Sequence, residues 1–178
     1  MLLGLCIAPV AASYVAYYFW QPSGHVNYGD LLDPRPIMPG GALALADGAP
    51  FRWNSLKGKW VLLTADSGRC DARCQQKLVY LRQVRLAQGK ESERIERVWL
   101  ITDDALPDAA LLAQHRGAWL IRASGGDVLN QFPVAGALAD HIFVIDPLGN
   151  LMMRYRADVD PRNMVKDMGR LLRHSRWK

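Results

Sequence analysis

The feature that most limits the folds open to this chain is an apolar run, WVLLTA, at residues 60–65. A continuous run of this length is typical of a strand that is buried on both faces, as the parallel strands of α/β sheets are. An amphipathic helix is predicted directly after it, over residues 71–88, and Gly89 ends that helix. Its apolar positions, which lie broadly on one side, are Leu78, Leu81, Val84 and Leu86. This strand–turn–helix unit indicates an α/β domain.

The rest of the domain continues the alternation of strands and helices. The expected strands are residues 42–46, 51–53, 95–102, 119–122, 142–145 and 151–155, and the expected helices are residues 107–115 and 161–174, with one helical turn at residues 128–132. The dipeptide Asp47-Gly48 closes the first two strands into a hairpin. This order predicts an α/β sandwich over residues 42–178, with one mixed sheet and helices on both faces.

The first 20 residues differ from everything that follows. They carry no charge, 17 of them are apolar, and three tyrosines and Trp20 lie at their far end. About 20 apolar residues can cross the hydrocarbon core of a membrane, and aromatic rings favour its interface. A cleavable signal peptide would have a basic start and a small-x-small cleavage site, and this segment has neither. We therefore expect residues 1–20 to be a retained transmembrane anchor. Residues 21–41, with four prolines and four glycines, are expected to be a semi-extended tether.

The charge pattern helps to exclude some classes of partner. The formal net charge is +5, and the first charged side chain is Asp30. No basic segment with interleaved aromatic residues and no recognised nucleic-acid motif accompanies this charge, so we expect no nucleic-acid partner. Gly-rich phosphate loops and Ser/His/Asp signatures are also absent from the sequence. The chemistry of this chain is therefore sought in its cysteines and histidines.

Cys70 and Cys74 are the strongest functional signal, because they lie where the predicted buried strand ends and the helix begins. Ligands bind at the carboxyl ends of strands in open α/β sheets, and a helix N-terminus favours a thiolate, as do Arg69 and Arg73 beside the pair. Residues i and i+4 share a helix face, so the two sulfurs could form a disulfide or bind a soft ion such as Cu(I). The alternatives are two buried small residues or a passive disulfide. Cys6, in the predicted anchor, is interpreted as a small apolar residue.

Other polar residues are weaker candidates. His141 opens a predicted strand and could be a neutral imidazole ligand, or its ring could be bonded to a backbone carbonyl. Asp66 could take part in proton transfer or be a turn residue, and Asp103-Asp104 could be a metal carboxylate pair or turn and N-cap residues. His115 is interpreted as a capping or surface residue at a helix end.

Four segments match the pattern of one known family. They are Cys70-x-x-x-Cys74 after a buried strand, VWLITDD at residues 98–104, Asp140-His141 ahead of the turn at residues 146–149, and DMGRLL at residues 167–172 in the final helix. In these segments the chain resembles the Sco/SenC family of thioredoxin-like copper-handling proteins, which assist assembly of cytochrome c oxidase. The resemblance covers about residues 42–174 and the anchor.

The resemblance implies a thioredoxin-like fold in which Cys70, Cys74 and His141 bind copper, as Cu(I) or Cu(II). In bacteria it implies a single-pass protein of the inner membrane with its domain on the periplasmic side. It also implies a cytochrome c oxidase subunit, or another copper or thiol protein, as the partner. One departure concerns Asp140, which occupies the region where ordinary thioredoxins place a cis-proline.

Together these features predict a membrane-anchored copper-binding thiol protein that assists copper-site assembly of cytochrome c oxidase, a copper chaperone more than a turnover enzyme. A thiol-disulfide reductase acting on partner cysteines is the first alternative, with Cys70 as nucleophile and Cys74 as resolving thiol. A non-catalytic assembly scaffold with an inert disulfide is the second.

Overall fold

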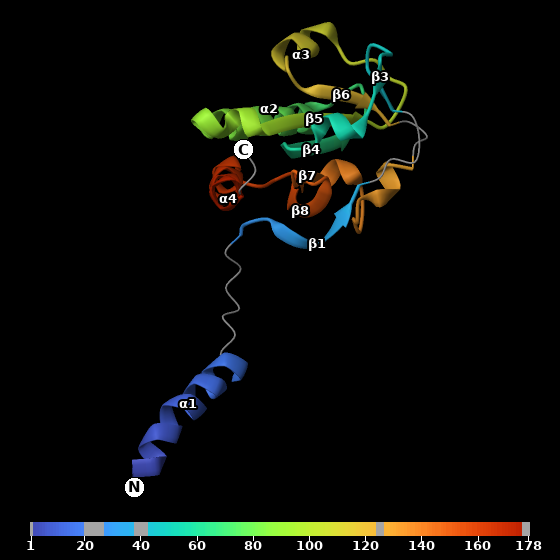
Figure 1. The fold of residues 1–178 in the computed structure, drawn as a ribbon. Helices are drawn as coiled ribbons and strands as arrows, with labels where there is room; N and C mark the ends of the chain where they lie inside the picture. The colour runs from blue at the N-terminus through green and yellow to red at the C-terminus, as the bar shows by residue number, and fades with distance from the viewer. Residues whose placement is uncertain (1, 20–26, 38–42, 124–126, 176–178) are drawn as a thin grey trace.

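The computed structural model describes residues 2–19, 27–37, 43–123 and 127–175, and within them one mixed sheet has eight strands in the order β1-β8-β7-β4-β5-β6-β2-β3 (Figure 1). The strands are β1 (Asp30–Pro36), β2 (Leu43–Leu45), β3 (Pro50–Phe51), β4 (Trp60–Asp66), β5 (Ile95–Ile101), β6 (Trp119–Arg122), β7 (His141–Ile145) and β8 (Asn150–Arg156). Strands β4, β5 and β6 run parallel, and the other neighbouring pairs are antiparallel. The predicted α/β fold with a central mixed sheet flanked by helices is confirmed.

The helices follow the predicted order. They are α1 (Leu2–Phe19), α2 (Ala72–Ala87), α3 (Ala109–Gln114) and α4 (Pro161–His174), with short 3-10 helices η1 (Trp53–Leu56), η2 (Gly89–Arg94), η3 (Leu129–Gln131) and η4 (Leu138–Asp140). Helix α4 has the predicted bounds, whereas α3 begins two residues later than expected, after its N-cap Asp108. The Asp108 carboxylate accepts hydrogen bonds from the backbone N–H groups of Ala110 and Leu111, which fixes the helix start there.

Strand β4 separates two parts of the core. All seven of its residues are buried, as its apolar run predicts. Val61, Leu63 and Ala65 pack into one hydrophobic cluster, and Trp60 and Leu62 pack into another, because successive side chains of a strand point to opposite faces. The central strand is therefore covered on both sides.

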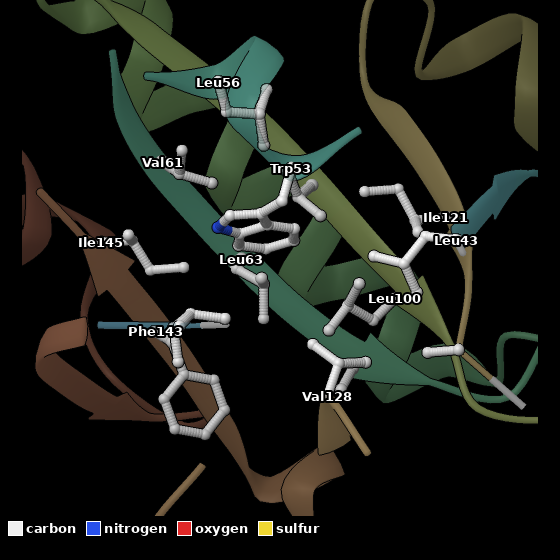
Figure 2. Close-up of a cluster of buried hydrophobic side chains, with 14 of the residues drawn as sticks. Leu43, Trp53, Leu56, Val61, Leu63, Leu100, Ile121, Val128, Phe143 and Ile145 are labelled. Atoms are coloured by element: carbon white, nitrogen blue, oxygen red, sulfur yellow. The ribbon is translucent and has the colours of Figure 1, made fainter. Parts of the chain in front are cut away.

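The first cluster lies on the face that is covered by η1 and by the segment after β6. Figure 2 shows Trp53 of η1 among side chains from several strands, with Leu63 and Val61 of β4 beside it and Phe143 of β7 further along the same face. Val128 also belongs to this cluster. The loops on this face therefore contribute much of the apolar volume that a helix would otherwise supply.

The opposite face is covered by α2 and α4. Buried residues of the second cluster come from both helices and from four strands: Trp60, Leu62, Leu81, Val84, Ile95, Ile142, Val144, Met153, Tyr155, Met164, Met168 and Leu172. A third, smaller cluster lies nearer the N-terminus of α2 and contains both cysteines. Helix α2 thus joins the main core to the cysteine pair.

Part of the predicted tether belongs to the sheet. Asp30–Pro36 forms β1, an antiparallel edge strand beside β8. The two prolines of this segment lack N–H groups, but an edge strand needs donors on one side only, so they are tolerated. Residues 21–26 and 38–41 of the predicted tether lie outside the described residues.

Helix α1 occupies most of the segment that was expected to anchor the protein. It has 18 residues and contains Pro9. Within the part of the chain that the structure describes, no helix is long and apolar enough to cross a membrane. The transmembrane anchor at residues 1–20 stays a prediction.

Candidate functional site

The two cysteines form a disulfide where β4 is connected to α2. Their Cα atoms are 5.1 Å apart. Strand β4 ends at Asp66 and α2 begins at Ala72, so Cys70 precedes the helix and Cys74 lies in its first turn. The predicted meeting of the two sulfurs is confirmed, but the reason given for it was wrong, because Cys70 is not a helical residue. Its φ of +44° lies in the left-handed region, which brings its sulfur back onto the first turn of α2.

Two side chains hold the helix start around the disulfide. Asp71 is the N-cap of α2, and its Oδ1 accepts a hydrogen bond of 2.9 Å from the Cys74 backbone N–H. Gln75 donates from Nε2 to the carbonyl oxygen of Cys70 at 3.0 Å. The cap satisfies a backbone donor of the first turn and fixes the helix start that carries the second sulfur.

The disulfide is buried. Cys70 is 2% exposed and Cys74 is 1% exposed, and both pack with Leu78, Trp99 and Leu111. A junction between a strand and a helix favours an exposed pair, whereas the structure shows a covered one. The reason is that α3 and strand β5 bring apolar side chains against the start of α2. A reductant or a metal donor must therefore displace part of this cover to reach the sulfurs.

A buried ion pair lies next to the cysteine loop. Lys77 Nζ is 2.5 Å from Asp66 Oδ2, and the two side chains are 0% and 10% exposed. Thr64 donates to the same carboxylate oxygen at 3.1 Å, and Lys77 also donates to the carbonyl oxygen of Ala139. Burial raises the pKa of Asp66, and the neighbouring ammonium group of Lys77 opposes that shift. Asp66 is thus not a turn residue: it is the last residue of β4 and one half of a desolvated charge pair.

Lys77 was not among the residues expected at the site, although the sequence carries a signal for it. Cys74, Leu78 and Leu81 define the buried face of α2, and Lys77 falls on that face and is fully buried. A lysine inside an apolar helical stripe requires a partner, because an unpaired buried charge is very costly. Only the tertiary structure shows which carboxylate pairs with Lys77.

His141 lies at the start of β7, and its Nδ1 is 3.3 Å from the carbonyl oxygen of Ala137. A carbonyl can only accept, so this contact requires a proton on Nδ1, and in the neutral tautomer that meets this condition the lone pair is on Nε2. The alternative in which the His141 ring is bonded to a backbone carbonyl is therefore correct. The same kind of hydrogen bond orients the ring of many metal-binding histidines, so it is compatible with a ligand role. Beside the ring, Asp140 forms an ion pair with Arg73, which lies between the two cysteines in sequence.

The predicted copper ligands are not gathered into one cluster. Among the residues that the structure describes, no group of three or more His, Cys, Asp or Glu side chains could hold a metal ion. Instead, His141 borders a polar cavity of about 420 Å³ whose other charged lining residues are Arg73, Asp140, Arg154, Arg156 and Asp158. In this structure the two sulfurs are bonded to each other, so Cys70 and Cys74 would have to be reduced before they could act as ligands.

Asp103 contacts the cysteine loop from the end of β5. It accepts hydrogen bonds from Ser67 Oγ at 2.5 Å and from the Gly68 backbone N–H at 2.9 Å. These two bonds, with the larger effect from Ser67, hold the pKa of the Asp103 carboxyl below its ordinary value. The turn interpretation of Asp103 is correct, since it also accepts from the Ala105 N–H at 3.2 Å, but its longer-range contacts were not anticipated.

His115 caps α3 but is not a surface residue. It is 4% exposed, and burial, with smaller effects from Arg82 and Arg97, lowers its pKa. The same two arginines bind carbonyl oxygens at the C-terminal end of α3: Arg82 donates to Gln114 at 2.9 Å and Arg97 donates to Arg116 at 2.8 Å. These cations complement the negative end of the helix and hold α3 against α2 and β5.

A mixed sheet with a disulfide at the junction of a central strand and the following helix defines a thioredoxin-like protein. Residues 60–175 match the family described as "Transmembrane-like, thioredoxin-like, C-terminal domain". The chain belongs to this family. No curated protein sequence matches it.

Solved structures with the same fold include copper-bound Sco proteins. The chain is similar to the copper-bound structure of Bradyrhizobium japonicum ScoI, with 16% identity and a TM-score of 0.58, over 76% of this chain and 99% of that one. It is similar to copper-bound Arabidopsis thaliana ScoI, with 16% identity and a TM-score of 0.62, over 79% of this chain and 100% of that one. The predicted resemblance to the Sco/SenC family is thus confirmed in the fold.

A second kind of protein shares the same architecture. The thioredoxin domain of a thiol-disulfide oxidoreductase from Bacteroides vulgatus is 19% identical to this chain, with a TM-score of 0.57, over 79% of this chain and 99% of that one. The structural similarities therefore include both copper-binding and disulfide-exchanging proteins.

Proposed function

We propose that this protein is a copper-binding thiol protein that assists copper-site assembly of cytochrome c oxidase. The observation that carries the proposal is the cysteine pair itself, whose two sulfurs are held together at the N-terminus of α2. Two thiolates at that spacing suit Cu(I), the soft ion that thiolate ligands select. The copper-bound Sco structures of the same fold support this function.

Copper is the cargo in this proposal, and its binding follows reduction of the disulfide. An external dithiol supplies two electrons and two protons, and the Cys70–Cys74 bond becomes two thiols. Both thiols then lose their protons as Cu(I) binds. His141 is the proposed third ligand through Nε2, with Nδ1 held by the Ala137 carbonyl oxygen.

Cu(I) titration of the reduced full-length chain, under anaerobic conditions and against a competing chelator, tests the copper proposal. We expect one equivalent to bind tightly, C70S and C74S to abolish that binding, and H141A to weaken it. C6S is the matched control, because it removes a thiol that the proposal does not use. Tight binding by the C70S/C74S double variant would overturn the proposal, and unchanged affinity in H141A would remove His141 from the site.

We further propose that residues 1–20 anchor the protein in the inner membrane, with the domain on the periplasmic side. The uncharged, apolar composition of this segment and its aromatic far end support the anchor. We expect the full chain to stay in the membrane pellet after an alkaline wash and a chain starting at residue 21 to be released. A C-terminal alkaline phosphatase fusion should be active if the domain is periplasmic. Release of the full chain would contradict the anchor, and an inactive fusion would contradict the periplasmic location of the domain.

Thiol-disulfide exchange with partner cysteines is the second candidate function. It is favoured by the formed disulfide beside a buried Asp66–Lys77 pair, since a buried carboxyl can exchange a proton during thiol chemistry. A reduced chain that reduces a partner disulfide but binds no copper would select this function. A chain that does neither would leave only the assembly scaffold with an inert disulfide.

A further inference from the structure

The loop before Cys70 is attached to a neighbouring loop by one carboxylate. Asp103 Oδ2 accepts from the Ser67 hydroxyl at 2.5 Å, and Asp103 Oδ1 accepts from the Gly68 N–H at 2.9 Å and the Ala105 N–H at 3.2 Å. The carboxylate therefore bridges the loop after β4 and the loop after β5. Three donors on a single carboxylate make a rigid connection, because bonds to an ionised acceptor are the strong ones.

The two loops approach each other as closely as their backbones allow. A Cβ atom at Gly68 would lie 2.0 Å from the carbonyl oxygen of Ala105, a separation that no real side chain could occupy. Gly68 is itself buried. Only glycine therefore fits at position 68 while the two loops stay in the contact that the Asp103 carboxylate stabilises.

This connection acts on the residue that carries the first sulfur. The Cys70 N–H donates to the Ser67 carbonyl oxygen at 3.1 Å, so the turn held by Asp103 leads directly into Cys70. Cys70 has a φ of +44°, a conformation that a non-glycine residue keeps only when its surroundings impose it. Ser67 holds it from the upstream side, and Gln75 holds its carbonyl group from the downstream side.

We propose that Asp103 is a positioning residue for the cysteine pair, which holds the Ser67–Gly68 turn so that Cys70 stays in its left-handed conformation with the disulfide covered. It does not touch the sulfurs and acts through the turn. The inference rests on the proposed redox activity of the pair, but its test requires only chemical reduction of the disulfide and does not depend on copper.

The test is the rate at which dithiothreitol reduces the disulfide in the oxidised full-length chain. A dithiothreitol thiolate attacks one sulfur, the other leaves as a thiolate, and the second dithiothreitol thiol then closes a cyclic disulfide, so the protein gains two electrons and two protons. Timed alkylation and mass spectrometry count the thiols formed. We expect D103N to be reduced about tenfold faster than the wild type, the size of effect expected from losing a hydrogen bond to a charged group.

Asp104 provides the matched control. It is the next residue, it is exposed, and D104N removes the same charge from the same loop. We expect D104N to be reduced at the wild-type rate, S67A and G68A to be reduced faster, and D103E, which keeps the carboxylate, to recover part of the protection. The S67A/D103N double variant should be no faster than D103N alone, because both changes remove the same connection.

A spectroscopic signal separates positioning from general destabilisation. The Gly68 amide proton is donated to a carboxylate, so its NMR resonance should move upfield in D103N and stay in place in D104N. Equal reduction rates in D103N and D104N would overturn the proposal, as would an unmoved Gly68 resonance. If D103N does not fold, S67A against D104N decides the question in the same way.

Discussion

At the scale of single residues, Lys77 has the environment least expected for its type. Its side chain is fully buried and its ammonium group is balanced by Asp66 at 2.5 Å and by the Ala139 carbonyl oxygen. Such a pair contributes little net stability, because desolvation offsets much of the attraction. Removing either charge, however, leaves the other one buried without a partner, which is costly in free energy.

Replacing Lys77 by Met should therefore destabilise the fold strongly. The Asp66 carboxylate would be left buried without its counter-charge, and breaking a buried pair in this way costs roughly 3–5 kcal/mol in the free energy of unfolding. Urea unfolding measures the loss. K90M is the control, since Lys90 is exposed. The D66N/K77M double variant should recover part of the stability, and a K77M loss as small as that of K90M would contradict the role of the pair.

His115 makes the stability depend on pH. Burial lowers its pKa below the ordinary value of 6.5, so the unfolded chain takes up the proton at a higher pH than the folded chain. The contribution of neutral His115 is thus fully present above about pH 6.5 and is lost as the pH falls toward the folded pKa, with a slope of at most about 1.4 kcal/mol per pH unit.

We expect the unfolding free energy of the wild type to fall between pH 7 and pH 5 and that of H115Q to fall less steeply. Urea unfolding at each pH provides the comparison. H174Q is the matched control, because His174 is exposed at the end of α4. Identical pH profiles for H115Q and the wild type would show that another group carries the dependence.

At the scale of elements, α4 holds the start of β1 through one buried carboxylate. Asp167 is 0% exposed, and its Oδ2 accepts from the N–H groups of Tyr28 at 2.8 Å and Gly29 at 3.1 Å and from the Tyr155 hydroxyl at 3.1 Å. Burial and the nearby carboxylate both raise the pKa of Tyr155, which keeps its hydroxyl a donor. The backbone N–H groups just before β1 are thus held by Asp167 of α4, which helps to keep the proline-rich segment at the edge of the sheet.

Substituting Asp167 by Asn should loosen β1. Asn keeps one acceptor oxygen but loses the charge and presents an NH₂ group, so we expect a loss of about 1.5–3 kcal/mol in the free energy of unfolding. Amide hydrogen exchange should speed up most in residues 28–36. D158N, an exposed change, should leave exchange there unaltered. Uniform destabilisation, with no preference for β1, would contradict this specific role for α4.

At the scale of the whole molecule, the disulfide is not what holds the domain together. Two large hydrophobic clusters cover the faces of the sheet, and the cysteines belong to neither of them. A disulfide that closes so short a loop restricts the unfolded chain by only about 2 kcal/mol. We therefore expect the fold to persist when the disulfide is reduced, as the proposed redox or copper-loading cycle requires.

Reduction of the full chain should lower its free energy of unfolding by about 2 kcal/mol and leave its secondary structure intact. Urea unfolding with and without reductant measures the difference, and far-ultraviolet circular dichroism checks the structure. The C70A/C74A variant should match the reduced protein in this assay. Unfolding on reduction would show that the disulfide is a structural staple, which favours the inert scaffold.

Elements with strong local patterns were predictable. The apolar run of β4 and the Pro161 start of α4 were located from sequence because burial on two faces and helix capping leave local signals. The place of the cysteines followed from the boundary between the apolar run of β4 and the amphipathic pattern of α2. By contrast, β1 was missed because its prolines are unfavourable everywhere in a sheet except at an edge, and only the structure shows which strand is the edge.

The sequence by itself determined the α/β class, because that class depends on periodicity, and the short spacing of Cys70 and Cys74 made a disulfide between them possible. The left-handed conformation of Cys70, which the structure shows, brings the two sulfurs together. Tertiary structure alone decided that the disulfide is covered, that Lys77 pairs with Asp66, and that Asp103 holds the turn before Cys70. The physical reason is that desolvation and hydrogen bonding depend on which distant residues are brought together, and no local pattern carries that information.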